Sequence, residues 1–169
     1  MKEMDEIDAL NRELRGVRVL KGVEVDVIGD GTLDFSDELL NRLDVVVAAV
    51  HMGFKKNVTE RLISAIENPY VDIIAHPTGR IISKREGYDV DLERVMEKAK
   101  EHDKVLELNA YYDRLDLGEL QLRRAKEIGV RISIGTDAHA VGEMRWMRFG
   151  MGIARRGWLE KGDVFNTIY

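Results

Sequence analysis

The stretch DVVVAAVH at residues 44–51 is a continuous apolar run that ends on a histidine. Such a run is typical of a strand that is covered on both faces, as in a parallel sheet flanked by helices. On either side of it, the apolar pattern switches repeatedly between the strand period and the helix period. Strands that alternate with helices predict parallel pairing through right-handed crossovers, and therefore an α/β fold.

The same pattern places the other elements. Strands are predicted at 17–28, 71–77, 104–110 and 130–139, with a last short strand near 148–153. Helices are predicted at 4–14, 37–42, 59–67, 91–101, 117–128 and 162–168. An open doubly wound sheet and a (β/α) barrel both fit this order. A complete barrel takes about 250 residues, so a chain of 169 residues is short for closure.

The composition is that of one globular domain over residues 1–169, with 44% apolar and 34% charged residues. Without cysteine there is no disulfide framework and no cysteine nucleophile or metal ligand. The acidic N-terminus does not resemble a signal peptide, and no apolar run approaches the roughly 20 residues of a membrane span. We therefore predict a cytoplasmic protein without a membrane partner. The net charge of −5 argues against a domain held on DNA mainly by nonspecific phosphate contacts.

Three of the four histidines fall at the ends of predicted strands. His51 ends DVVVAAVH, His76 ends DIIAH, and His139 follows ISIGTD. In both barrels and open α/β sheets, the carboxyl ends of the strands form the edge that holds the site. His102 lies instead at the end of a predicted helix, and we assign it to the surface.

Acidic residues join the same edge. Glu24 lies in the otherwise apolar strand GVEVDVI, where a carboxylate is costly unless it is paired or bound to a cation. Asp137 ends its strand two residues before His139, and Glu107 and Asn109 share one face of LELN. Nitrogen and oxygen ligands of this kind suit Zn²⁺, Mn²⁺ or Fe²⁺. The predicted metal ligands are Glu24, His51, His76, Asp137 and His139.

Each of these residues also has a purely structural interpretation. A single histidine at a strand end is more often a hydrogen-bonded structural residue. Glu24 taken alone could pair with a buried arginine or lysine, and Asp137 could cap a helix. The metal site is favoured because independent structural roles would not all be expected at one edge of the sheet.

Seven segments occur in an order that resembles a known family: GVEVDV, VVVAAVH, DIIAHPTGR, EGYDVDLERV, LELNA, RISIGTDAH and FGMGIARRGWL. They are similar to the PHP (polymerase and histidinol phosphatase) domain, and above all to the C-terminal domain of bacterial and archaeal family X DNA polymerases. The similarity runs from about residue 5 to the end of the chain. The more distant histidinol phosphatases share the glutamate, the strand-end histidines and the Asp-x-His, with looser surroundings.

The resemblance implies a distorted (β/α) barrel with a centre of up to three metal ions, usually Mn²⁺, Zn²⁺ or iron. Glu24 matches the glutamate that bridges metals, and His51 and His76 match the strand-end ligands. Asp137 and His139 match the closing Asp-x-His, and Asn109 matches an asparagine beside the site, which we take to support the ligands. In the polymerases this domain is linked to 3′–5′ exonuclease and related DNA-end phosphoesterase activities.

One departure concerns the start of the barrel. The family's barrel begins with a His-x-His strand that supplies several ligands, whereas this sequence has no histidine before His51. We therefore expect a single, N-terminally truncated PHP-type domain over 1–169, an incomplete barrel, one or two metals instead of three, and uncertain activity. An open sheet edge would also invite self-association.

The predicted reaction is metal-assisted hydrolysis of a phosphoester. Glu24 would bridge metals, and Asp137 would bind metal and orient the water. Arg80 is predicted to grip a phosphate bidentately, or else to be a solvated surface residue. The substrate would be a DNA 3′ end, with a polymerase domain in the full-length protein. The alternatives are a small-molecule phosphatase of the histidinol-phosphatase type and an inactive module that only supports a polymerase or partner.

Overall fold

The computed structural model describes residues 2–167, and its centre is one sheet of five parallel strands. The strands are β1 (Gly22–Asp26), β2 (Val45–Ala49), β3 (Ile73–Ile74), β4 (Val105–Asn109) and β5 (Ile132–Gly135). They pair in the order of the chain, β1-β2-β3-β4-β5, and β1 and β5 lie at opposite ends of an open sheet. A doubly wound sheet would reverse its strand order part-way. The predicted α/β fold of incomplete barrel type is therefore confirmed.

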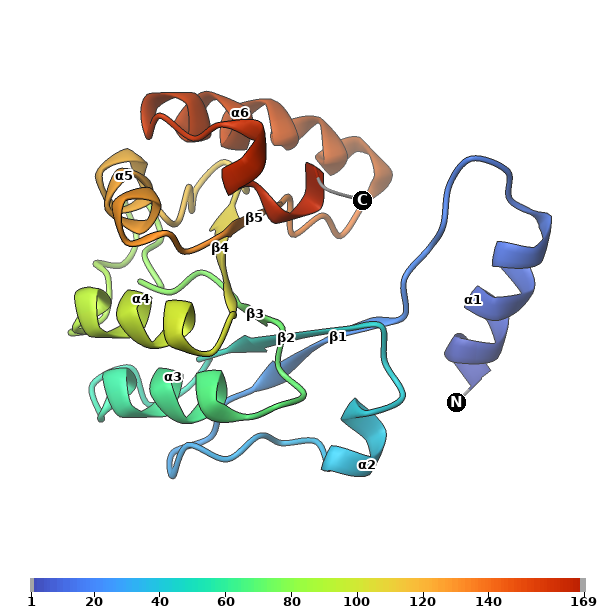
Figure 1. Cartoon of the computed structure of the whole chain (residues 1–169), viewed down its shortest axis with the longest axis horizontal. Helices are drawn as coiled ribbons and strands as arrows, with labels where there is room; N and C mark the ends of the chain where they lie inside the picture. The colour runs from blue at the N-terminus through green and yellow to red at the C-terminus, as the bar shows by residue number, and fades with distance from the viewer. Residues whose placement is uncertain (1, 168–169) are drawn as a thin grey trace.

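One helix precedes the first strand, and the others follow the strands in turn. They are α1 (Lys2–Glu13), α2 (Asp37–Leu40), α3 (Val58–Glu67), α4 (Leu92–Glu101), α5 (Glu119–Ile128) and α6 (Met147–Arg156). Short 3₁₀ turns are η1 (Val141–Trp146), η2 (Lys161–Asp163) and η3 (Phe165–Thr167). Figure 1 shows α3, α4, α5 and α6 as a layer over one side of the sheet, while α1 stands apart on the other side. Each helix in residues 2–167 is too short or too polar to cross a bilayer.

The two faces of the sheet differ in burial because side chains alternate along each strand. Val25, Ala48, Ile74, Leu106 and Ile132 align across the sheet and are fully buried beneath the helices. On the opposite face of β2, Val45 and Val47 are half-buried and Ala49 is buried. The predicted cover on both faces of β2 therefore holds only in part, because in an open sheet no further strands lie across from the inner face.

Some predicted boundaries are also wrong. The strand expected from Val17 begins at Gly22. The helix expected at 162–168 is two short 3₁₀ turns, and residue 168 lies outside the described residues. The strand expected at 148–153 is the helix α6, in which Gly150 faces the sheet. A β-carbon at Gly150 would lie 2.7 Å from the Cβ of Ala110, so glycine at this position permits close packing of the helix on the strand ends.

Two asparagines replace missing strand partners. Asn166 accepts the N–H of Ile134 at 3.1 Å and donates to its carbonyl at 2.9 Å, on the open side of β5. Asn11 makes the equivalent pair of hydrogen bonds with Val19, at 2.8 and 2.7 Å, in the extended segment before β1. Each amide therefore satisfies backbone groups that a neighbouring strand would otherwise bond. The predicted self-association of the chain stays a prediction, as does its single domain.

Candidate metal centre

Glu24, His51 and His76 come together at the carboxyl edge of the sheet, from three neighbouring strands. Glu24 lies in β1, and the two histidines lie two residues beyond the ends of β2 and β3. The Glu24 Oε1 atom is 3.0 Å from Nε2 of His51 and 3.5 Å from Nε2 of His76. One ligand atom from each residue lies within 4.8 Å of the other two, so the three side chains could hold a metal ion.

His76 is the buried member of this cluster, with 2% of its surface exposed. Within residues 2–167, neither of its ring nitrogens has a hydrogen-bond partner, and the 3.5 Å approach of Glu24 is too long for a good one. A buried polar group without a partner costs roughly 1–3 kcal/mol. A cation bound to the ring would remove that cost, so the buried imidazole fits a metal ligand.

Asp26 orients the ring of His51, because its Oδ1 atom lies 2.5 Å from His51 Nδ1. If Asp26 accepts a hydrogen bond from Nδ1–H, the other ring nitrogen, Nε2, carries the lone pair. Nε2 then faces the carboxylate of Glu24 at 3.0 Å. Two acceptors that close need a proton or a cation between them. Sequence reasoning missed Asp26, although its position in GVEVD places it on the same face of the strand as Glu24.

The charge of Glu24 suits a ligand. The contact with the His76 imidazole is the largest cause that lowers the pKa of the Glu24 carboxyl, against the opposing effect of burial. Coulombic interactions with His76, His51 and the Arg114 guanidinium lower this pKa further. Glu24 is therefore ionised at neutral pH, as a metal-binding carboxylate must be.

Glu107 is a second carboxyl on the inner face, and its pKa is shifted in the opposite direction to that of Glu24. Part of the residue reaches the surface, but Oε2 accepts the backbone N–H of His76 at 2.7 Å, and a β-carbon on Gly135 would lie 2.8 Å from Oε1. Burial raises the pKa of Glu107 to about 8, and the charges of Glu24 and Asp137 raise it too, while the N–H of His76 lowers it. The protonated carboxyl holds the backbone of His76, which has a left-handed φ of 28°.

Asp137 lies at the same edge but outside the cluster of three. Its Oδ2 atom is 3.3 Å from the amide nitrogen of Asn109 and 3.8 Å from Nε of Arg114. Like His76, it has a left-handed backbone, with φ of 51°. Residues held in such conformations concentrate at functional sites. The charge of Arg114 also lowers the pKa of Glu24, so this guanidinium acts on both carboxylates. Sequence reasoning did not single out Arg114.

His139 is also outside the cluster, with 78% of its side chain exposed. Its Nδ1 atom lies 2.8 Å from the carbonyl oxygen of Asp137, and its N–H donates to Glu143 at 2.7 Å. The structure therefore brings together Glu24, His51 and His76 of the five predicted ligands. The metal-binding roles of Asp137 and His139 stay predictions.

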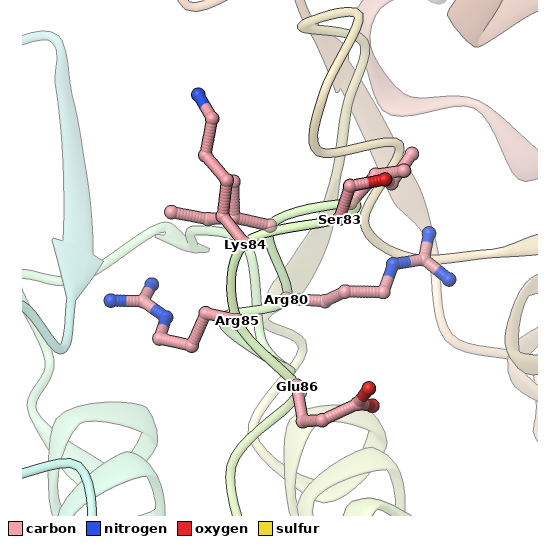
Figure 2. Close-up of a pocket in the computed structure, with 7 residues that line it drawn as sticks. Arg80, Ser83, Lys84, Arg85 and Glu86 are labelled. Atoms are coloured by element: carbon pink, nitrogen blue, oxygen red, sulfur yellow. The ribbon is translucent and has the colours of Figure 1, made fainter.

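Arg80 lies in a loop after β3 that lines a cavity of about 530 Å³. Figure 2 shows Arg80 and Arg85 extending to opposite sides of this loop. Arg80 donates to the carbonyls of Arg114 (3.1 Å) and Leu115. These contacts fasten the loop after β3 to the loop after β4, and the predicted grip on a phosphate stays a prediction.

Arg61 is a buried positioning residue that sequence reasoning missed. Its guanidinium donates to the carbonyls of Ile28 at 3.0 Å and Met52 at 2.8 Å, and to that of Val27. It thereby ties the loop after β1 to the loop after β2, next to His51. The available signal was its place on the apolar stripe of α3, three residues after Val58.

Two sequence relatives bear on the family of this chain. The DNA polymerase/3′-5′ exonuclease PolX of Bacillus subtilis (strain 168) is 45% identical over 169 residues, which cover 98% of this chain and 30% of that protein. A probable phosphatase of Thermoanaerobacter sp. (strain X514) is 33% identical over 175 residues, which cover 95% of this chain and 69% of that protein. The chain belongs to the PHP family. No protein-family model matches this PHP chain.

Solved structures support the PHP fold. Histidinol phosphate phosphatase from Lactococcus lactis, complexed with zinc, L-histidinol and phosphate, aligns with a TM-score of 0.64 at 13% identity. The alignment covers 94% of this chain and 74% of that one. A chain in the structure of archaeal ribonuclease P with mature tRNA aligns with a TM-score of 0.54 at 19% identity, over 95% of this chain and 78% of that one. At these identities the likeness shows the fold alone.

Proposed function

We propose that this PHP-family chain hydrolyses phosphate esters with a divalent metal held by Glu24, His51 and His76. The observation that carries the proposal is the convergence of three ligand atoms around a buried imidazole without a hydrogen-bond partner. A divalent ion in such a site supplies Lewis-acid stabilisation of a phosphoryl oxygen and a bound water of lowered pKa. Mn²⁺, Zn²⁺ and Fe²⁺ are the candidates, with one or two ions in this chain.

The chain's own residues have distinct parts in this proposal. Asp26 fixes the ring of His51, and Glu107 holds the backbone of His76. Asn109 orients the carboxylate of Asp137, which we keep as a ligand and as the group that orients water. His139 is kept as the fifth ligand because it follows β5 at the same edge. The guanidinium of Arg114, beside Glu24 and Asp137, adds positive charge where a phosphate would approach.

For the substrate, we favour a DNA 3′ end, with a polymerase domain in the full-length protein. The support is the 45% identity with a protein named as a polymerase and 3′-5′ exonuclease. The second candidate is a small-molecule phosphatase, supported by a probable phosphatase of which this chain covers 69%. The cytoplasm stays the predicted location.

Metal analysis combined with hydrolysis tests the proposal. Protein stripped by a chelator and reloaded with Mn²⁺ or Zn²⁺ should retain about one equivalent or more and hydrolyse bis(4-nitrophenyl) phosphate. His76→Ala should abolish both properties. His102→Ala is the control, because His102 follows α4 at the opposite edge of the sheet. Less than one equivalent of metal, with no hydrolysis, would identify an inactive supporting module instead.

A further inference from the structure

Three aromatic side chains form a cluster at the rim of the candidate metal centre. Tyr111 and Tyr112 follow β4, and Trp146 ends the turn η1 after β5. The ring centroids of Tyr111 and Trp146 are 4.3 Å apart, those of Tyr112 and Trp146 are 5.2 Å apart, and the two tyrosine rings stack at 5.1 Å. Tyr112 remains 52% exposed, so the cluster presents an aromatic surface to solvent.

Hydrogen bonds fix this aromatic cluster to the site. The N–H of Tyr111 donates to Oδ1 of Asn109 at 3.0 Å, and the amide of the same Asn109 donates to Asp137 at 3.3 Å. On the other side, η1 carries both Trp146 and Glu143, and Glu143 accepts the N–H of His139 at 2.7 Å. The rings are therefore held beside the loop that carries Asp137 and His139.

Charges of both signs lie near the aromatic cluster. Burial and the charges of Glu143, Asp113 and Asp137 raise the pKa of Tyr111, while residues 144–159 contain four arginines and no acidic residue. Arg145 and Arg148 lie on either side of Trp146 in the sequence and are exposed. An ordinary packing role would bury the rings, whereas half of Tyr112 is exposed beside the candidate metal centre. Exposed aromatic rings bind the bases of single-stranded nucleic acid by stacking.

We propose that Tyr111, Tyr112 and Trp146 form a nucleobase-stacking subsite, so that the phosphate esters taken by the neighbouring centre are those of nucleotides. This inference rests on the proposed function and names the residues that would select nucleotides from other phosphate esters. The exposed ring of Tyr112 would stack on the base, and Arg145 and Arg148 would face phosphate groups. Stacking tolerates any base, since each base has an aromatic face.

Fluorescence of Trp146 tests the subsite directly. The chain has two tryptophans, and Trp158→Phe leaves Trp146 as the only one. This variant is titrated with deoxyadenosine 5′-monophosphate and with 2-deoxyribose 5-phosphate, which carries the same phosphate without a base. We expect the nucleotide to quench Trp146 and to bind about tenfold more tightly than the sugar phosphate. Equal dissociation constants, or no binding of either probe, would overturn the subsite.

A second pair of variants assigns the effect to the cluster. Tyr112→Ala should remove most of the preference for the nucleotide. Leu120→Ala, at an exposed apolar residue of α5 (77% exposed), should leave it unchanged. A preference that survives Tyr112→Ala would contradict the assignment.

The titrations are repeated on metal-free protein to separate this proposal from the proposed function. A base preference without metal binding or hydrolysis would support the subsite and reject the metal centre. Metal-dependent hydrolysis with no base preference would support the metal centre and reject the subsite. It would also favour a small phosphate ester as the substrate.

Discussion

The Nδ1 atom of His51 lies 2.5 Å from the carboxylate of Asp26, which turns the opposite ring nitrogen toward Glu24. A carboxylate behind a histidine ligand fixes the ring and raises its basicity. We therefore expect Asp26→Asn to weaken metal binding by roughly 10- to 100-fold without unfolding the protein. Competition with a chromophoric chelator measures the change. Asp89→Asn, at an exposed carboxylate, is the control, and equal affinities for the two variants would show that Asp26 has no such role.

His139→Ala separates a ligand from a surface histidine. Because the His139 side chain is 78% exposed, its removal should leave the unfolding temperature nearly unchanged. If it binds metal once an ion is present, the metal content at saturation should fall. Elemental analysis beside the wild type and His102→Ala gives the answer, and an unchanged content would remove His139 from the proposed ligands.

Glu107 should make the metal-free protein less stable as the pH rises. Its carboxyl has a pKa of about 8 in the folded protein and an ordinary value of 4.5, so the folded state holds one more proton between these values. The stability from this group is complete below about pH 4.5 and is lost as the pH rises to about 8.

Glu107→Gln should remove this pH dependence, because a neutral amide does not titrate and its oxygen still accepts the N–H of His76. Each unit of pKa difference corresponds to about 1.4 kcal/mol. The free energy of unfolding of the variant should therefore exceed that of the wild type by a few kcal/mol at pH 8.5 and by little near pH 5. Urea unfolding in the presence of a chelator measures both. Glu97→Gln, at an exposed residue of α4, should show no such divergence. Parallel curves for wild type and Glu107→Gln would refute the raised pKa.

Two glycines of α6 form a matched pair. A β-carbon at Gly150 would lie 2.7 Å from Ala110 and 2.8 Å from Ile134, whereas one at Gly152 meets nothing within 4 Å. Gly150→Ala should therefore lower the free energy of unfolding by about 1–3 kcal/mol through overpacking. Gly152→Ala should raise it by about 0.5–1 kcal/mol, because alanine is the better helix former. A stabilising Gly150→Ala would mean that α6 packs less closely than described.

The sequence was a good guide wherever apolar periodicity decided the structure. The five strands and the convergence of Glu24, His51 and His76 follow from parallel strands whose carboxyl ends meet at one edge. Periodicity failed at α6, where glycines hide the apolar stripe of the helix. It also could not show Asp26 behind His51 or Arg61 beneath the loops, because those contacts depend on how the loops after the strands turn.

The paired hydrogen bonds of Asn166 with Ile134 make the two edges of the sheet unequal. They occupy backbone groups of β5 that a further strand would bond. The equivalent hydrogen bonds of Asn11 lie at Val19, before β1, and β1 in the described residues has a strand neighbour on one side only. A sixth strand, from the same polypeptide or from another, would therefore be expected to dock beside β1. Because Glu24 lies in β1, any metal ligands on the added strand would lie next to the metal-binding carboxylate. The same strand would then extend both the sheet and the set of metal ligands.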